Sequence, residues 1–205
     1  MDIALPNNLV RLCGTLASPP TFSHENRGQA FYLLPLAVDR LSGTTDTLPV
    51  LLRREQLERL AVEGAEKLCA EGEMRTYNNH RGEGARLVIT VFAREIGFCG
   101  DPDSNEVLLA GTLCREPVLR RTPMGREICD LLLAVNRRYG RSDYLPCICW
   151  GRTARQCAQL GVGARVRLKG RFQSRPYIKL IDGKPVEKIA YEVSAASVER
   201  EKNAL

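Results

Sequence analysis

The chain has 205 residues, 44% hydrophobic and 26% charged, which is the composition of a folded globular protein. No apolar run approaches the ~18 residues that a membrane span needs, and the N-terminus lacks the features of a secretory signal. We therefore expect a cytoplasmic protein without membrane contact. The net charge of +6 is unevenly divided. Residues 1–103 carry 11 Lys and Arg against 14 Asp and Glu, a net charge of −3, whereas residues 104–205 carry 19 against 10, a net charge of +9. The second half therefore favours a polyanionic partner.

The two halves of the chain repeat each other. Residues 8–49 align without a gap with residues 105–146, and 17 of these 42 positions are identical. A period near 100 residues indicates a duplicated domain. The cluster of Gly, Pro and Asp at 97–104 is typical of a linker. We predict one domain at 1–103 and a second at 104–205.

Each copy contains the same predicted elements. In the second copy they are, in chain order, a strand at Val107–Leu113, a turn at Glu116–Pro117, a hairpin turn at Thr122–Gly125, strands at Glu127–Asn136 and Asp143–Trp150, a helix at Arg152–Leu160, a strand at Ala164–Gln173, a loop at 181–184 and a strand at Lys188–Val198. The first copy has the equivalent first strand at Val10–Leu16, and its helix at Glu55–Glu63 is expected to stop at Gly64. Five strands with one helix between the third and fourth predict an all-β protein with one short helix per domain, as two tandem five-stranded OB-fold barrels.

The strand at 143–150 alternates between two kinds of side chain. One parity holds Leu145, Cys147 and Cys149, and the other holds Tyr144, Pro146, Ile148 and Trp150. Because the small aliphatic set suits a barrel interior, the set with the rings should face outward. Exposed rings flanked by arginines are unusual for a strand that needs only to be soluble. We interpret this face as a platform on which nucleic-acid bases stack, with burial of Trp150 in a subunit interface as the alternative.

Eight cysteines are many for this length, but their spacing indicates no special chemistry. None forms a Cys-x-x-Cys pair, and His24 and His80 are the two histidines. We expect neither disulfides nor a zinc site, and reduced thiols that fill the core as small hydrophobic groups. Cys147 and Cys149 share a face and could chelate a metal in principle. Phosphate loops, His-Glu-x-x-His motifs and nucleophile–histidine pairs are missing, so we predict no enzyme, no catalytic residue, no cofactor and no metal.

Six segments of the second copy carry recognisable motifs: Asn105–Leu113, Glu116–Gly125, Leu133–Tyr139, Asp143–Tyr144, Trp150–Gly151 and Gly170–Tyr177. In these segments the copy resembles the bacterial single-stranded DNA-binding protein family. The resemblance implies sequence-nonspecific binding of single-stranded DNA in replication, recombination and repair, in the bacterial nucleoid. It implies base stacking on Tyr139, Tyr144, Trp150 and Tyr177. The basic positions that fit phosphate binding are Arg120, Arg137, Arg138, Arg152 and Arg175.

The first copy departs from this pattern at the same sites. Ser42, Thr47, Arg53 and Asn79 stand where the second copy has its four rings, although the inward set is kept as Leu48, Val50 and Leu52. The first copy is therefore predicted to be mainly a structural or assembly domain.

The resemblance also raises the question of partners. Family members commonly assemble four OB-folds, which implies a homodimer of this two-domain chain. They also carry an acidic tip that recruits replication proteins, and the chain ends at Leu205 without one, which leaves such recruitment in doubt. Two alternatives stay open: a primosome-type accessory protein that acts as an adaptor between replication proteins, and single-stranded RNA binding.

Overall fold

The computed structural model describes residues 6–61, 66–79, 87–181 and 183–201. The first half contains β1 (Asn8–Leu16), β2 (Thr21–Asn26), β3 (Gln29–Asp39), β4 (Thr45–Arg53), α1 (Arg54–Leu60), β5 (Lys67–Asn78) and β6 (Leu87–Phe98). The second half contains β7 (Ser104–Leu113), β8 (Val118–Arg121), β9 (Glu127–Asn136), β10 (Ser142–Trp150), α2 (Gly151–Cys157), β11 (Arg165–Ile181) and β12 (Lys184–Arg200). In the described part of the chain neither helix has the length and apolar character needed to cross a membrane.

Each half closes into a barrel of five strands. In the first half, β1 pairs with both β3 and β5, β3 pairs with β4, β5 pairs with β6, and a short parallel pairing of β4 with β6 completes the ring. In the second half, β7, β9, β10, β12 and β11 form the same ring, closed by the parallel pair β10–β12. Strands β2 and β8 add hairpin arms to β3 and β9. The prediction of two tandem five-stranded OB-fold barrels is confirmed.

The glycines shared by the two copies lie where strands cross closely. A Cβ atom on Gly14 would lie 2.2 Å from the carbonyl oxygen of Ala37, and one on Gly111 would lie 2.4 Å from that of Ala134. Real Cβ atoms do not approach so closely, so any larger residue would force the strands apart. Glycine within a strand commonly marks such a close backbone approach.

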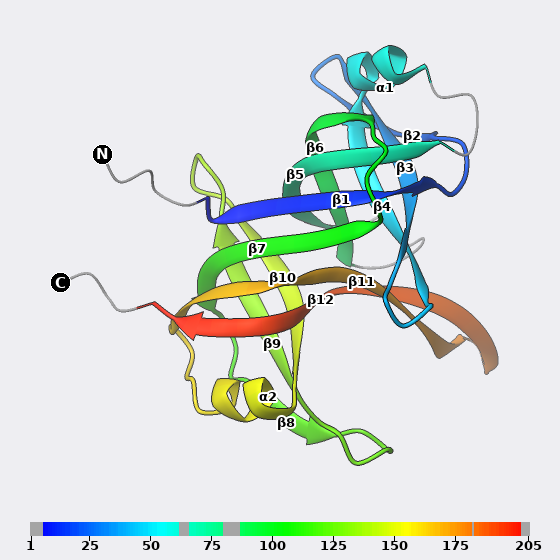
Figure 1. Cartoon of the computed structure of the whole chain (residues 1–205). Coiled ribbons are helices and arrows are strands. Elements are labelled where there is room, and N and C mark those ends of the chain that lie inside the picture. The colour runs from blue at the N-terminus through cyan, green and yellow to red at the C-terminus, as the bar shows by residue number, and fades with distance from the viewer. Residues whose placement is uncertain (1–5, 62–65, 80–86, 182, 202–205) are drawn as a thin grey trace.

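The two barrels are joined by their first strands. β1 and β7 lie side by side and antiparallel across the middle of the molecule, with Val10 opposite Val107, so that the strands of both barrels belong to one continuous sheet (Figure 1). The connection between them, residues 99–103, is held down by Asp103. Its carboxylate accepts a hydrogen bond of 2.7 Å from the backbone N–H of Asp39 and pairs with Lys67 at 2.6 Å.

Equivalent loops of the two barrels cross to the opposite barrel. After β3, the buried carboxylate of Asp46 pairs with Arg40 and accepts hydrogen bonds from the backbone N–H and the hydroxyl of Ser174 on β11, at 2.8 and 2.9 Å. Burial by itself would raise the pKa of Asp46, but the hydrogen bonds from Arg40 and Ser174 outweigh it and lower the pKa below its ordinary value. An ionised Asp46 therefore braces one barrel against the other.

Asp143 makes the matching contact in the other direction. Its fully buried carboxylate binds Arg137 of its own barrel and accepts hydrogen bonds from the guanidinium of Arg75 and the backbone N–H of Thr76 on β5, at 3.3 and 2.6 Å. Asp46 and Asp143 are aligned in the repeat, as are Arg40 and Arg137. The repeat thus encodes a pseudo-two-fold interface between the barrels, stabilised by two equivalent Asp–Arg pairs.

The ends of several elements differ from the sequence prediction. The predicted strands that stopped at Gln173 and began at Lys188 continue as β11 to Ile181 and as β12 from Lys184, because the two strands pair with each other beyond the barrel in an exposed arm. Residue 182 of the predicted loop lies outside the described residues. Helix α2 ends at Cys157, three residues earlier than predicted, and continues as a turn. In the first copy the predicted helix end, Glu63 and Gly64, also lies outside the described residues.

Candidate nucleic-acid interface

The outer face of the second barrel carries a groove of 1080 Å³, here called the C-terminal groove. Trp150 lines it, and Ile128, Ile148 and Ser194 contribute the apolar and small part of its lining. Six basic residues line it as well: Arg40, Arg120, Arg126, Lys169, Arg171 and Arg175. Among the described residues that line this groove, Glu192 is the one acid. A concave, mainly positive surface with an indole ring is suited to a polyanion that has flat aromatic groups.

The predicted alternation along β10 is confirmed. Leu145, Cys147 and Cys149 are buried in the barrel, whereas Tyr144 and Trp150 are 50% and 40% exposed. Ile148 has the outward parity but is only 4% exposed, and it lines the floor of the groove. Trp150 is therefore not part of the barrel core.

Four of the six basic residues in the groove, Arg40, Arg126, Lys169 and Arg171, were missed by sequence reasoning. Arg126, Lys169 and Arg171 form no ion pair with any described residue, so their charges are available to a ligand. Lys169 and Arg171 flank Gly170 with the same outward parity on β11, a signal that was present in the sequence. By contrast, two of the predicted cations are paired. Arg120 donates a hydrogen bond to the carboxylate of Asp130, which raises the pKa of Arg120. Arg175 lies 3.6 Å from the carboxylate of Glu192.

The nine predicted site residues do not form one surface. Trp150, Arg120 and Arg175 line the C-terminal groove, whereas Tyr139, Arg137 and Arg138 line a second hollow of 1220 Å³, here called the inter-barrel hollow. That hollow also receives Asn8, Arg27, Glu73, Arg75 and Arg94 of the first barrel, because the loop between β9 and β10 crosses to it (Figure 1).

Within this second hollow, Tyr139 and Arg137 have different surroundings. Tyr139 is 98% exposed and has a φ of 71°, a conformation that is uncommon for a large side chain and tends to occur at functional sites. The guanidinium of Arg137, in contrast, binds the Asp143 carboxylate and donates to the carbonyl oxygen of Thr76 at 3.0 Å. Arg137 therefore holds the two barrels together, and its charge is already neutralised.

The remaining three predicted residues line neither hollow. Tyr144 has an exposed ring, and its backbone N–H donates to the hydroxyl of Thr76 at 3.1 Å. Tyr177 is 38% exposed on the β11 arm, directly after Pro176, which lines the C-terminal groove. Arg152 is exposed on α2, beside Trp150 but outside the groove.

The same face of the first barrel is filled by its own side chains. Arg53 occupies the position of Trp150, and its guanidinium carbon lies 4.7 Å from the ring centre of Phe92. Phe92, which stands where the second barrel has Ser194, contacts Phe31 at a centroid distance of 6.2 Å. His24 lies on β2 and stacks on Phe31 with 4.9 Å between the ring centres, while His80 is outside the described residues.

The prediction of reduced cysteines is wrong for Cys13 and Cys69. They form a disulfide, because they are direct neighbours on β1 and β5 although 56 residues separate them in the sequence. Spacing along the chain could not reveal this neighbourhood. In the second barrel the expectation is confirmed: Cys129, Cys147, Cys149 and Cys157 are buried free thiols. Burial raises the pKa of Cys129 to about 11, so it stays protonated.

Comparison with known proteins agrees with this architecture. Residues 104–200 match the model of the single-strand binding protein family. The chain is 32% identical over 110 residues to single-stranded DNA-binding protein B of Bacillus subtilis, an alignment that covers 42% of this chain and 97% of that protein. It is 36% identical over 102 residues to single-stranded DNA-binding protein 2 of Listeria innocua, which covers 46% of this chain and 62% of the relative. The chain spans between 48% and 62% of the length of four such curated relatives.

A solved structure resembles both barrels together. The crystal structure of the wild-type single-stranded DNA binding protein from Thermus aquaticus superposes with a TM-score of 0.79 and 26% identity, covering 97% of this chain and 94% of that one. The fold and the groove define a tandem OB-fold protein whose second barrel carries an open, mainly positive groove. More specifically, the chain belongs to the single-strand binding protein family.

Proposed function

We propose that this chain binds single-stranded DNA without strong sequence preference, in replication, recombination and repair in the bacterial cytoplasm. The observation that carries the proposal is the C-terminal groove, which Trp150 lines together with Arg126, Lys169 and Arg171, three cations that form no ion pair within the described part of the chain. Stacking of a base on an aromatic ring contributes about 1–3 kcal/mol and needs no particular sequence. Cations that neutralise phosphates release counterions, which adds affinity that falls with salt. A duplex keeps its bases inside the stack, so the ring selects single strands.

We further propose a division of labour between residues 1–103 and residues 104–205. The first barrel provides the partner strand β1 and the brace at Asp46, while its own outer face is occupied by Arg53, Phe92 and Phe31. The second barrel has the open face and the excess of positive charge. This supports a structural or assembly role for the first barrel and DNA binding by the second.

The test uses Trp150, the one tryptophan of the chain. Oligo-dT should quench its fluorescence, and the quenching should weaken as salt is added. In Trp150→Ala the binding free energy, measured by anisotropy of a labelled oligonucleotide, should weaken by about 1–3 kcal/mol, because one base loses the indole ring on which it stacks. Phe98→Ala, which removes an exposed ring from the first barrel, is the matched control and should bind as the wild type does. Equal affinities for Trp150→Ala and wild type would contradict the proposal.

We also propose that two chains associate into a homodimer with four OB-folds. Supporting it, the β11–β12 arm leaves Ile178, Leu180 and Ile189 exposed on a single chain, which is more apolar surface than an arm in water needs. Light scattering at micromolar concentration should give the mass of two chains, and a monomer would contradict this part of the proposal.

A further inference from the structure

Three cysteine sulfurs meet at one point of the first barrel, away from both hollows described above. Cys13 lies on β1, Cys69 lies opposite it on β5, and Cys99 follows the end of β6. Their sulfur atoms all lie within 4.8 Å of one another. The position of Cys99 is fixed by its backbone, since its N–H donates a hydrogen bond of 3.1 Å to the carbonyl oxygen of Lys67.

A disulfide accounts for two of these sulfurs but not for the third. The Sγ atom of Cys99 lies 2.6 Å from that of Cys69, well inside the ~3.5–4.0 Å at which unbonded atoms of this size pack. Cys69 is therefore placed between two sulfur neighbours at once. One small cation bound equally to all three sulfurs would resolve this crowding, because zinc–thiolate bonds of about 2.3 Å hold sulfur atoms apart while keeping them around one centre.

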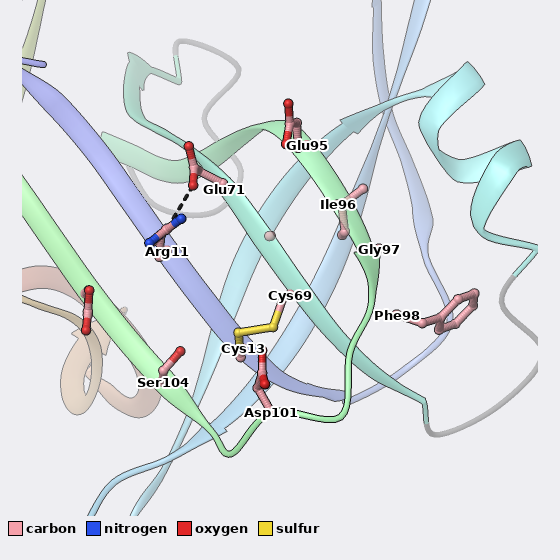
Figure 2. A pocket seen from close by; sticks show the side chains of 12 residues that line it. Arg11, Cys13, Cys69, Glu71, Glu95, Ile96, Gly97, Phe98, Asp101 and Ser104 are labelled. Atoms are coloured by element: carbon pink, nitrogen blue, oxygen red, sulfur yellow. Dashed lines mark hydrogen bonds and ion pairs between the residues drawn. A yellow bond between two sulfur atoms is a disulfide. The ribbon is translucent and has the colours of Figure 1, made fainter.

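The surroundings of the cluster favour a cation. The cysteines Cys13 and Cys69 lie in a pocket of 580 Å³ that opens to solvent, so an ion has a path to them (Figure 2). The pocket is lined by four acidic residues, Glu71, Glu95, Asp101 and Glu106, and, within the described part of the chain, by one cation, Arg11. Arg11 is itself paired with Glu71 at 2.8 Å. The net negative charge that remains attracts a divalent metal ion, and a carboxylate or a water molecule could complete a tetrahedral set.

The cluster is not a feature of the OB barrel itself. At the equivalent positions of the second barrel, Ala110 and Arg167 face each other on β7 and β11. The pairing of β7 with β11 therefore forms without cysteines at these two positions. The first barrel has acquired thiols at two paired positions and a third at the start of the linker to β7.

We infer that Cys13, Cys69 and Cys99 form a three-thiolate site for one zinc ion in the reduced protein. The Cys13–Cys69 disulfide is the oxidised, metal-free form of the same site. A phosphine reductant supplies two electrons to the disulfide and becomes a phosphine oxide, while one water molecule supplies the oxygen of the oxide and the two protons of the freed thiols. Zinc then displaces the thiol protons as it binds. Through Cys99 the ion connects β1 and β5 to the linker between the barrels.

The experiment titrates the full-length, phosphine-reduced protein with Co²⁺, whose thiolate complexes absorb by charge transfer, and then displaces the cobalt with Zn²⁺. One Co²⁺ per chain with a thiolate charge-transfer band is expected. Cys99→Ser should weaken metal binding by roughly tenfold or more, and this residue lies outside the strand ladder, so the barrel should keep its circular dichroism spectrum. Cys114→Ser, a half-buried free thiol of the second barrel, is the matched control and should bind as the wild type does.

Two results would overturn the inference. The first is a titration without a thiolate band, which would mean that the three reduced thiols do not bind a metal ion together. The second is a band that persists unchanged in Cys99→Ser and in Cys13→Ser, which would place the metal at other thiols. Neither result affects DNA binding through Trp150, so the proposed function is tested separately.

Discussion

The two barrels of this chain share a backbone and differ in one outer face. In the second barrel, Ser194 leaves room beside Trp150, and the face is a groove. In the first barrel, Phe92 stands where Ser194 would be, and Arg53 packs over its ring. The strands, the glycines at close crossings and the buried Asp46 and Asp143 are the same in both. If the proposed division of labour holds, a few side chains on one face separate a binding barrel from a structural one, while the core is preserved.

The largest expected effect is on the free energy of unfolding, when the buried aspartate that both barrels share is removed. Asp46→Ala should lower the free energy of unfolding by about 3–5 kcal/mol, because it leaves Arg40 and the backbone of Ser174 without their buried partner. Urea unfolding measures this change. Asp39→Ala, at an exposed acid near the same loop, is the control and should cost less than about 1 kcal/mol. If both variants unfold alike, the brace does not stabilise the pair of barrels.

The same brace makes stability depend on pH. Because folding lowers the pKa of Asp46, its contribution is fully present above the ordinary value of 3.8 and is lost as the pH falls through the lower pKa of the folded protein. The difference in unfolding free energy between wild type and Asp46→Ala should therefore shrink below pH 3.8.

The next prediction exchanges the residue that distinguishes the outer faces of the two barrels, Ser194 in the second and Phe92 in the first. Ser194→Phe copies Phe92 into the C-terminal groove and should cover the ring of Trp150. Affinity for oligo-dT should then fall by about 1–3 kcal/mol, the contribution of one stacked base. The reciprocal change Phe92→Ser should leave affinity unaltered, since residues 1–103 carry a net charge of −3. Wild-type binding by a folded Ser194→Phe protein would show that the open groove is not the binding face.

The smallest effect tests the charges. Removing Lys169 and Arg171 should reduce the slope of log affinity against log salt by about 0.7 for each phosphate that is no longer neutralised. Arg54→Ala with Arg59→Ala, two exposed arginines of α1, removes the same charge from the first barrel. A salt slope that changes equally in both double variants would mean that net charge, rather than the groove, sets the salt dependence.

Much of the fold was predictable because it is encoded locally. Alternation along residues 143–150 distinguishes the buried Leu145 from the exposed Trp150, since successive residues of a strand face opposite sides. The repeat of residues 8–49 in residues 105–146 shows two copies of one fold. The ends of β11 and β12 were missed because an exposed two-stranded arm lacks the one-sided alternation of a barrel strand.

The arrangement of the site depended on contacts between distant parts of the chain. The resemblance implied base stacking on both Tyr139 and Trp150, and the crossing of the β9–β10 loop puts Tyr139 in the inter-barrel hollow, apart from the groove that Trp150 lines. The sequence also suggested Arg137 as a phosphate ligand. In the folded protein its guanidinium instead donates hydrogen bonds to the carboxylate of Asp143 and the carbonyl oxygen of Thr76.

The sequence by itself determined the duplicated OB-fold, the outward Trp150 and the basic second half, because periodicity and composition act over neighbouring residues. Only the tertiary structure decided which barrel has an open groove, which acids brace the barrels and which cysteines meet. These depend on strand pairing, such as β1 with β5 and with β7, that brings together residues far apart in the chain. Their chemistry is set by those neighbours, which no local pattern contains.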